Sequence, residues 1–179
     1  MCVAAAQNTI LWTTNYYTVT GASAREIRSS LTRSRPRQVE TGMDAATRWR
    51  LEWSFTTQLG PSGCRCTGFT TRTLITVILP RWTPPTNSPP DAALRAHWSR
   101  YQAGLGAHEL GHAQLALAAA AELHKHVKEL ETLGESADCA ALERRLNQAG
   151  QRVLDHYGKL EKDYDAKTRH GVTQGASFP

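Results

Sequence analysis

Five consecutive residues carry the strongest chemical signal in this chain: His108-Glu109-Leu110-Gly111-His112. They match the pattern H-E-x-x-H. In a helix, residues four apart project from one face about a turn apart, so the two imidazoles can hold one Zn²⁺. Glu109 then lies beside the metal, where its carboxylate can take a proton from a zinc-bound water. The spacing predicts zinc-assisted hydrolysis; the simpler alternative is a helix with two incidental histidines.

A catalytic zinc usually has three protein ligands and an open position for water, so a third ligand must be found. The longer metzincin pattern fails, because Leu115 and Ala118 stand where its glycine and third histidine would be. Other histidines of the same predicted helix lie about three turns or more from the motif, namely His97, His124 and His126. The candidates near the end of the chain are His170, Glu161 and Asp165.

The helix that must position the motif is expected to run from Ala92 to about residue 133. Asp91 follows a proline and can cap it. Gly104 and Gly111 fall on its metal-facing side, where the lack of a side chain permits a neighbouring backbone to approach closely. A second long helix is expected from about Ser136 to Tyr164, with a turn between the helices near Gly134.

The N-terminal half is predicted to form β-strands. Residues 16–20 form a β-rich run, and residues 47–57 alternate apolar and polar side chains. A turn at 60–63 leads into a returning strand at 67–79. Between the first two strands, Ser23 and Glu26 predict the capped start of a short helix. Five prolines within residues 80–90 exclude a helix or a central strand there.

These elements predict an α+β fold, in which a small antiparallel sheet from the N-terminal half packs on two long C-terminal helices. The first of these is a zincin-like active-site helix. Length and composition favour one globular domain over residues 1–179. Its expected parts are a β-rich segment 14–80, a proline-rich linker 80–90, a helical segment 91–166 and a tail 167–179. Four tryptophans are expected in the core rather than on a binding surface: Trp49, Trp53, Trp82 and Trp98.

The net charge of +5 is concentrated early in the chain, at arginines 25, 28, 33, 35 and 37. No nucleic-acid motif accompanies them, so we expect a solvated surface and no nucleic-acid partner. No segment is long and apolar enough for a membrane span. The apolar start, residues 1–6, is too short for a signal-peptide core.

The four cysteines are Cys2, Cys64, Cys66 and Cys139. Their even number suggests disulfides and an oxidising compartment, with buried free thiols as the alternative. A bond from Cys64 or Cys66 to Cys139 would join the strands to the second long helix, but the sequence does not choose the pairing.

Several motifs spread over residues 14–178 resemble the DUF922 family, described as secreted zinc-dependent proteases of bacteria. Its most specific matches are the H-E-x-x-H motif and the closing run 164–171, Tyr-Asp-Ala-Lys-Thr-Arg-His-Gly. The closing run favours His170 as the third zinc ligand, with Gly171 suited to a chain reversal that returns the imidazole to the metal. Asp165 would then accept a hydrogen bond from a ligand histidine. Tyr164 would donate one to the developing oxyanion, or else pack at the helix end.

The working hypothesis is a zinc metallopeptidase, secreted or periplasmic, in which Glu109 acts as general base on a protein or peptide substrate. Two alternatives stay open. One is a zinc-stabilised binding or assembly module without turnover, although a degenerate site often loses the glutamate. The other is a hydrolase of cell-wall peptide amides. The sequence does not indicate the oligomeric state.

Overall fold

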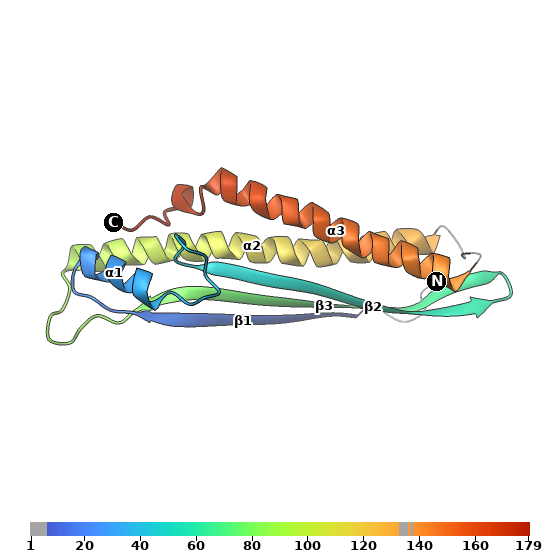
Figure 1. Cartoon of the computed structure of the whole chain (residues 1–179), viewed down its shortest axis with the longest axis horizontal. Coiled ribbons are helices and arrows are strands. Elements are labelled where there is room, and N and C mark those ends of the chain that lie inside the picture. Colours follow the sequence, from blue (N-terminus) through green and yellow to red (C-terminus); the bar gives the residue numbers. More distant parts are fainter. Residues whose placement is uncertain (1–6, 133–135, 137) are drawn as a thin grey trace. The chain divides into compact units, whose positions relative to one another are not determined.

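The computed structural model describes residues 7–132, 136 and 138–179, so that Cys2 and Gly134 lie outside the described residues. The chain begins with β1 (Gln7–Val19), α1 (Ala24–Ser34), β2 (Ala46–Gly60) and β3 (Gly63–Trp82). It continues through α2 (Ala92–Thr132), α3 (Cys139–Thr168) and a short 3₁₀ turn, η1 (Val172–Gln174) (Figure 1). The three strands form one sheet in the order β1-β3-β2.

The predicted α+β class is confirmed, because this small sheet packs on the two long helices. β2 and β3 are neighbours joined through a two-residue turn at Pro61 and Ser62, which makes them an antiparallel hairpin. β1 begins well before the predicted strand 16–20. Its first ten residues are exposed, so no buried face marks them as a strand in the sequence.

The helix starts follow the predicted capping chemistry. The Ser23 hydroxyl accepts a hydrogen bond from the Glu26 amide at 3.3 Å. The Asp91 carboxylate accepts one from the Leu94 amide at 2.7 Å. Each cap satisfies a backbone donor that the first helical turn leaves without a partner.

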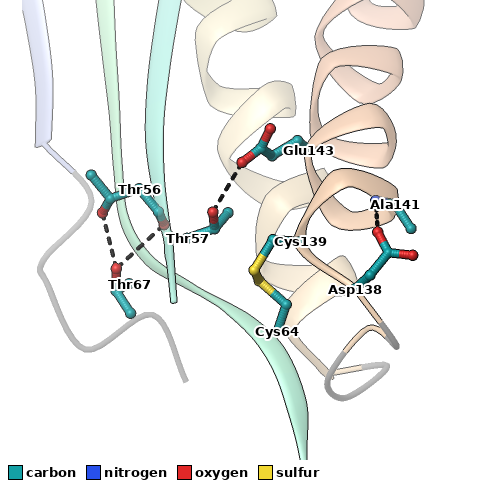
Figure 2. The surroundings of a disulfide bond; sticks show 8 residues. All are labelled: Thr56, Thr57, Cys64, Thr67, Asp138, Cys139, Ala141 and Glu143. Carbon is teal, nitrogen blue, oxygen red and sulfur yellow. Dashed lines mark hydrogen bonds between the residues drawn. A yellow bond between two sulfur atoms is a disulfide. The ribbon is translucent and has the colours of Figure 1, made fainter. Parts of the chain in front are cut away.

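The prediction for α3 was wrong at both ends. Ser136 does not start the helix but bridges to Cys64 of β3 in antiparallel fashion. Asp138 supplies the cap instead, accepting from the Ala141 amide at 2.6 Å (Figure 2). At its other end α3 continues to Thr168, past the predicted end at Tyr164, so that Asp165 is helical.

The chain divides into two compact units. Unit 1 comprises Met1–Leu11, Trp49–Ile75 and Gln114–Glu161. Its core is an apolar cluster that includes Leu51, Phe69, Leu123, Leu146 and Val153, with Trp49 and Trp53 packed against it. Burying one such side chain contributes about 1.5–3 kcal/mol.

A disulfide within unit 1 joins Cys64 to Cys139 (Figure 2). It links β3 to the start of α3, which is one of the two pairings that the sequence left open. Nearby, the Thr57 hydroxyl donates to the Glu143 carboxylate at 3.0 Å, a second link between the hairpin and the same helix. Cys66 is a buried free thiol.

Unit 2 comprises Trp12–Arg48, Thr76–Ala113 and Lys162–Pro179. Its core cluster joins Val19, Ile27 and Leu31 to the aromatic side chains of Tyr101 and Phe178. Trp98 belongs to this core and Trp82 packs against it, so the expectation of core tryptophans holds here also. The H-E-x-x-H motif and the end of the chain both belong to this unit.

Candidate metal centre

His108 and His112 lie on α2 and are both buried, exposing 5% and 6% of their surface. Their Nε2 atoms are 3.2 Å apart, so the two lone pairs converge on one point as the four-residue spacing predicts. Glu109, between them in sequence, is 4% exposed. Its backbone carbonyl accepts a hydrogen bond from the Thr47 hydroxyl of β2 at 3.0 Å, which ties this turn of the helix to the sheet.

Asp165 of α3 brings a carboxylate to the same point. Its Oδ1 is 3.2 Å from His108 Nε2 and 3.1 Å from His112 Nε2. Among the described residues, His108, His112 and Asp165 form a group that could hold a metal ion. Glu161 is not a member of it.

The donor set and its dimensions fit zinc. Ligands of a tetrahedral zinc with bonds of about 2.0 Å are roughly 3.3 Å apart. The three donor atoms lie 3.1 to 3.2 Å from one another, close to this spacing. Two imidazoles and one carboxylate are also ligands that zinc accepts in catalytic sites.

His170 lies next to the cluster. Its Nδ1 is 3.5 Å from Asp165 Oδ1, and its side chain is 51% exposed. The predicted chain reversal is present: Arg169, His170 and Gly171 all have positive φ, with Gly171 at 84°. The reversal therefore brings the imidazole of His170 to Asp165, while its predicted role as a metal ligand stays a prediction.

Tyr164 packs directly on the histidines. Its ring stacks on His108 with centroids 5.1 Å apart, and its hydroxyl donates to the His108 carbonyl at 3.3 Å. A Cβ on Gly111 would collide with the Tyr164 ring, so the glycine makes room for this side chain. At Gly104 the close neighbour is the backbone of Gly175 and Ala176, as the sequence led us to expect.

Two residues that were not predicted from the sequence contact the ring nitrogen of His108 that faces away from the cluster. Its Nδ1 lies 3.1 Å from the side-chain oxygen of Gln174 and 3.3 Å from the Thr168 hydroxyl. Because Gln174 Oε1 can only accept, Nδ1 carries the proton and Nε2 keeps its lone pair towards the cluster. The Gln174 side chain also donates to the Tyr164 hydroxyl at 3.0 Å.

The electrostatics of the site also favour metal binding. Burial, followed by the neighbouring imidazole of His112, lowers the pKa of His108 below its ordinary value. Its ring is therefore neutral at pH 7, and a neutral imidazole is the form that binds metals.

Residues 14–171 match a family described as bacterial proteins of unknown function, DUF922. The chain belongs to the DUF922 family. The match includes the metal cluster and ends at Gly171, three residues before Gln174. Neither the curated proteins nor the solved structures yield a match to this DUF922 chain. This description assigns no activity, so the secreted zinc-dependent protease that the resemblance implied stays a prediction.

Proposed function

We propose that this DUF922 protein is a zinc-dependent metallopeptidase. The observation that carries the proposal is the convergence of Asp165 Oδ1 on the two Nε2 atoms of the H-E-x-x-H motif, at 3.2 and 3.1 Å. Zinc held there by His108, His112 and Asp165 would lower the pKa of a water molecule to about 7 and polarise a peptide carbonyl.

The residues of the chain supply the rest of the chemistry. Glu109 adjoins His108, and its carboxylate accepts the proton of the attacking water and passes it to the leaving amine. Gln174 and Thr168 fix the His108 ring, so that its Nε2 does not turn away from the cluster. The Tyr164 ring packs on both histidines, and its hydroxyl would exchange its hydrogen bond to the His108 carbonyl for one to the oxygen that gains negative charge.

The third protein ligand is either Asp165 or His170. The carboxylate of Asp165 contacts the Nε2 atoms of both His108 and His112. The imidazole of His170 is exposed and lies next to the Asp165 carboxylate. We therefore assign Asp165 as the third ligand, with His170 beside its carboxylate. The two candidates are distinguished by one comparison: the zinc content of Asp165→Ala against that of His170→Ala.

Elemental analysis of the purified chain tests the metal, and Glu109→Gln tests the reaction. We expect about one zinc per chain, lost in His108→Ala and in Asp165→Ala. Glu109→Gln should keep the zinc and lose cleavage of casein or of a peptide library by about a thousandfold or more. A native chain that binds zinc but cleaves no peptide would support the binding-module alternative instead, and a chain without zinc after reconstitution would refute the metal site.

We also propose that the protein works outside the cytoplasm. The family is bacterial, and a disulfide such as Cys64–Cys139 persists in the periplasm or outside the cell. No helix in the described part of the chain has the length and apolar character needed to cross a bilayer. Mass spectrometry of the protein from a periplasmic fraction, with thiols blocked before lysis, should find this bond intact.

A further inference from the structure

A groove of about 290 Å³ opens on unit 2 and has no part in the metal centre. Tyr17 and Asn15 of β1, Thr76 of β3 and Arg48 of β2 line it, together with Pro36 and Gln38 from the segment after α1. This volume is near the lower end of small-ligand sites, roughly 300–1,000 Å³. The groove therefore suits one or two side chains of a ligand rather than a folded domain.

The groove is surrounded by positive charge that nothing in its walls neutralises. None of its lining residues is acidic, and Arg48 forms no ion pair with any described residue. The guanidinium of Arg81 lies 4.0 Å over the ring of Tyr16, which also lines the groove. Arg35 adjoins Pro36 and lies close enough to Tyr17 for its charge to oppose the rise in that tyrosine's pKa, which burial and Asp44 cause.

The nearby carboxylate of Asp44 does not cancel this charge, because it is already engaged. Its Oδ2 accepts from Arg28 at 2.7 Å and from the Tyr101 hydroxyl at 2.6 Å. Arg48 is thus left with five N–H donors in a planar fork, beside amides and a hydroxyl that can bond to a peptide backbone. A planar guanidinium can donate two parallel hydrogen bonds to the two oxygens of one carboxylate.

We propose that this groove binds an acidic peptide segment, with Arg48 holding a glutamate or aspartate carboxylate and Arg35 and Arg81 adding attraction. The aromatic residues argue against a nucleic acid. Arg81 covers one face of the Tyr16 ring, and Tyr17 is only 8% exposed, so the two tyrosines do not form a pair of open rings on which successive bases could stack. The site is independent of the metal chemistry.

Fluorescence anisotropy with the full chain tests the groove. The probes are a short labelled peptide that contains glutamates, its counterpart with glutamines in their place, and a labelled single-stranded oligothymidylate. We expect the glutamate peptide to bind more tightly than the glutamine peptide. Arg48→Gln should weaken binding of the glutamate peptide by about tenfold and leave the glutamine peptide unchanged. Arg48→Lys, which keeps the charge without the fork, should fall between the two.

Arg50→Gln is the matched control. Arg50 follows two residues later on β2, its side chain is 76% exposed, and it pairs with Glu52 at 2.9 Å. Its removal should change the affinity by no more than about twofold. If Arg48→Gln and Arg50→Gln lose the same affinity, the attraction comes from positive charge in general and the proposal is overturned. Equal binding of the two peptides, or tighter Arg48-dependent binding of the oligonucleotide, would overturn it as well.

Discussion

Gln174 holds the ring of His108 by the nitrogen that faces away from the cluster, at 3.1 Å. Such contacts orient a ligand histidine, and losing one costs about 10- to 100-fold in metal affinity. We therefore expect Gln174→Leu to weaken zinc binding by that factor, measured by competition with a chromophoric chelator. Gln174→Glu keeps an acceptor for Nδ1 and should retain most of the affinity.

The matched control for this residue is Gln151→Leu. Gln151 is exposed on α3 and bonds only to its neighbour Asp155 among the described contacts. An unchanged zinc affinity in Gln174→Leu would show that Thr168 alone suffices to orient the ring. The ¹⁵N chemical shifts of His108 in metal-free protein provide a second readout, because they report which ring nitrogen carries the proton whether or not zinc binds.

His124 makes a separate prediction about pH. Its Nε2 lies 2.7 Å from the Thr71 hydroxyl, and burial, followed by the charge of Lys128, lowers its pKa. The unfolded chain, with a histidine pKa of about 6.5, thus takes up this proton more readily than the folded chain. The stability that the neutral ring contributes is present above about pH 6.5 and is lost as the pH falls through the folded pKa.

Replacing His124 by glutamine should therefore make the free energy of unfolding fall less steeply between about pH 7 and pH 5. Urea unfolding at several pH values measures this slope. His156→Gln, at an exposed position of α3, is the control and should leave the slope as in the native chain. A native-like slope in His124→Gln would show that the acid sensitivity arises elsewhere.

At the scale of elements, alanine substitutions at two glycines of α2 distinguish the effect of close packing from that of helix propensity. A Cβ at Gly104 would meet the backbone of Gly175, whereas one at Gly106 meets nothing within 4 Å. We expect Gly106→Ala to stabilise the chain by about 0.5–1 kcal/mol, since alanine is the better helix former. Gly104→Ala should destabilise it by about 1–3 kcal/mol, because the tail must move away.

Urea unfolding of the two variants, with zinc affinity measured alongside, distinguishes these effects. The displaced tail carries Gln174, so Gly104→Ala should also weaken zinc binding, while Gly106→Ala should not. Similar stabilities for the two variants would mean that the tail does not depend on contact with α2.

The helices were predictable because their signals are local. Ser23 and Asp91 cap the helices that they precede, and the four-residue spacing of His108 and His112 sets their common face. Local signals fail at the start of α3, where Ser136 pairs with a residue 72 positions earlier. They fail also for Gln174, whose contact with His108 spans 66 positions and depends on the left-handed turn at 169–171.

The third side chain of the candidate metal centre shows the same limit of local signals. The sequence places Asp165 and His170 five residues apart, and either side chain can bind zinc. Only the continuation of α3 to Thr168 aims Asp165 at the two histidines and leaves His170 in the turn. The fold class and the motif could therefore be predicted, but which of these two side chains lies at the histidines depends on the packing of two helices.

At the scale of the whole molecule, β2, β3, α2 and α3 each contribute residues to both compact units. A strand or helix that is shared in this way cannot unfold in one unit without losing its continuation. We therefore expect a single unfolding transition, in keeping with the single domain predicted from the sequence. Far-ultraviolet circular dichroism and tryptophan fluorescence should give the same midpoint, and two separated midpoints would show independent units.

We expect the disulfide to contribute a large part of the free energy of unfolding. Cys64 and Cys139 are 75 positions apart, and closing a loop of this length in the unfolded chain corresponds to about 4.5 kcal/mol in the loop-entropy treatment. We expect the double variant Cys64→Ala/Cys139→Ala to lose about this much free energy of unfolding in urea. Adding a reducing agent should lower the stability of the native chain by a similar amount but leave the double variant unchanged.

Cys66→Ala, which removes a buried thiol outside the bond, is the control and should respond to the reducing agent as the native chain does. A native chain that is equally stable with and without the reducing agent would show that packing of Cys64 and Cys139, and not their bond, holds β3 to α3.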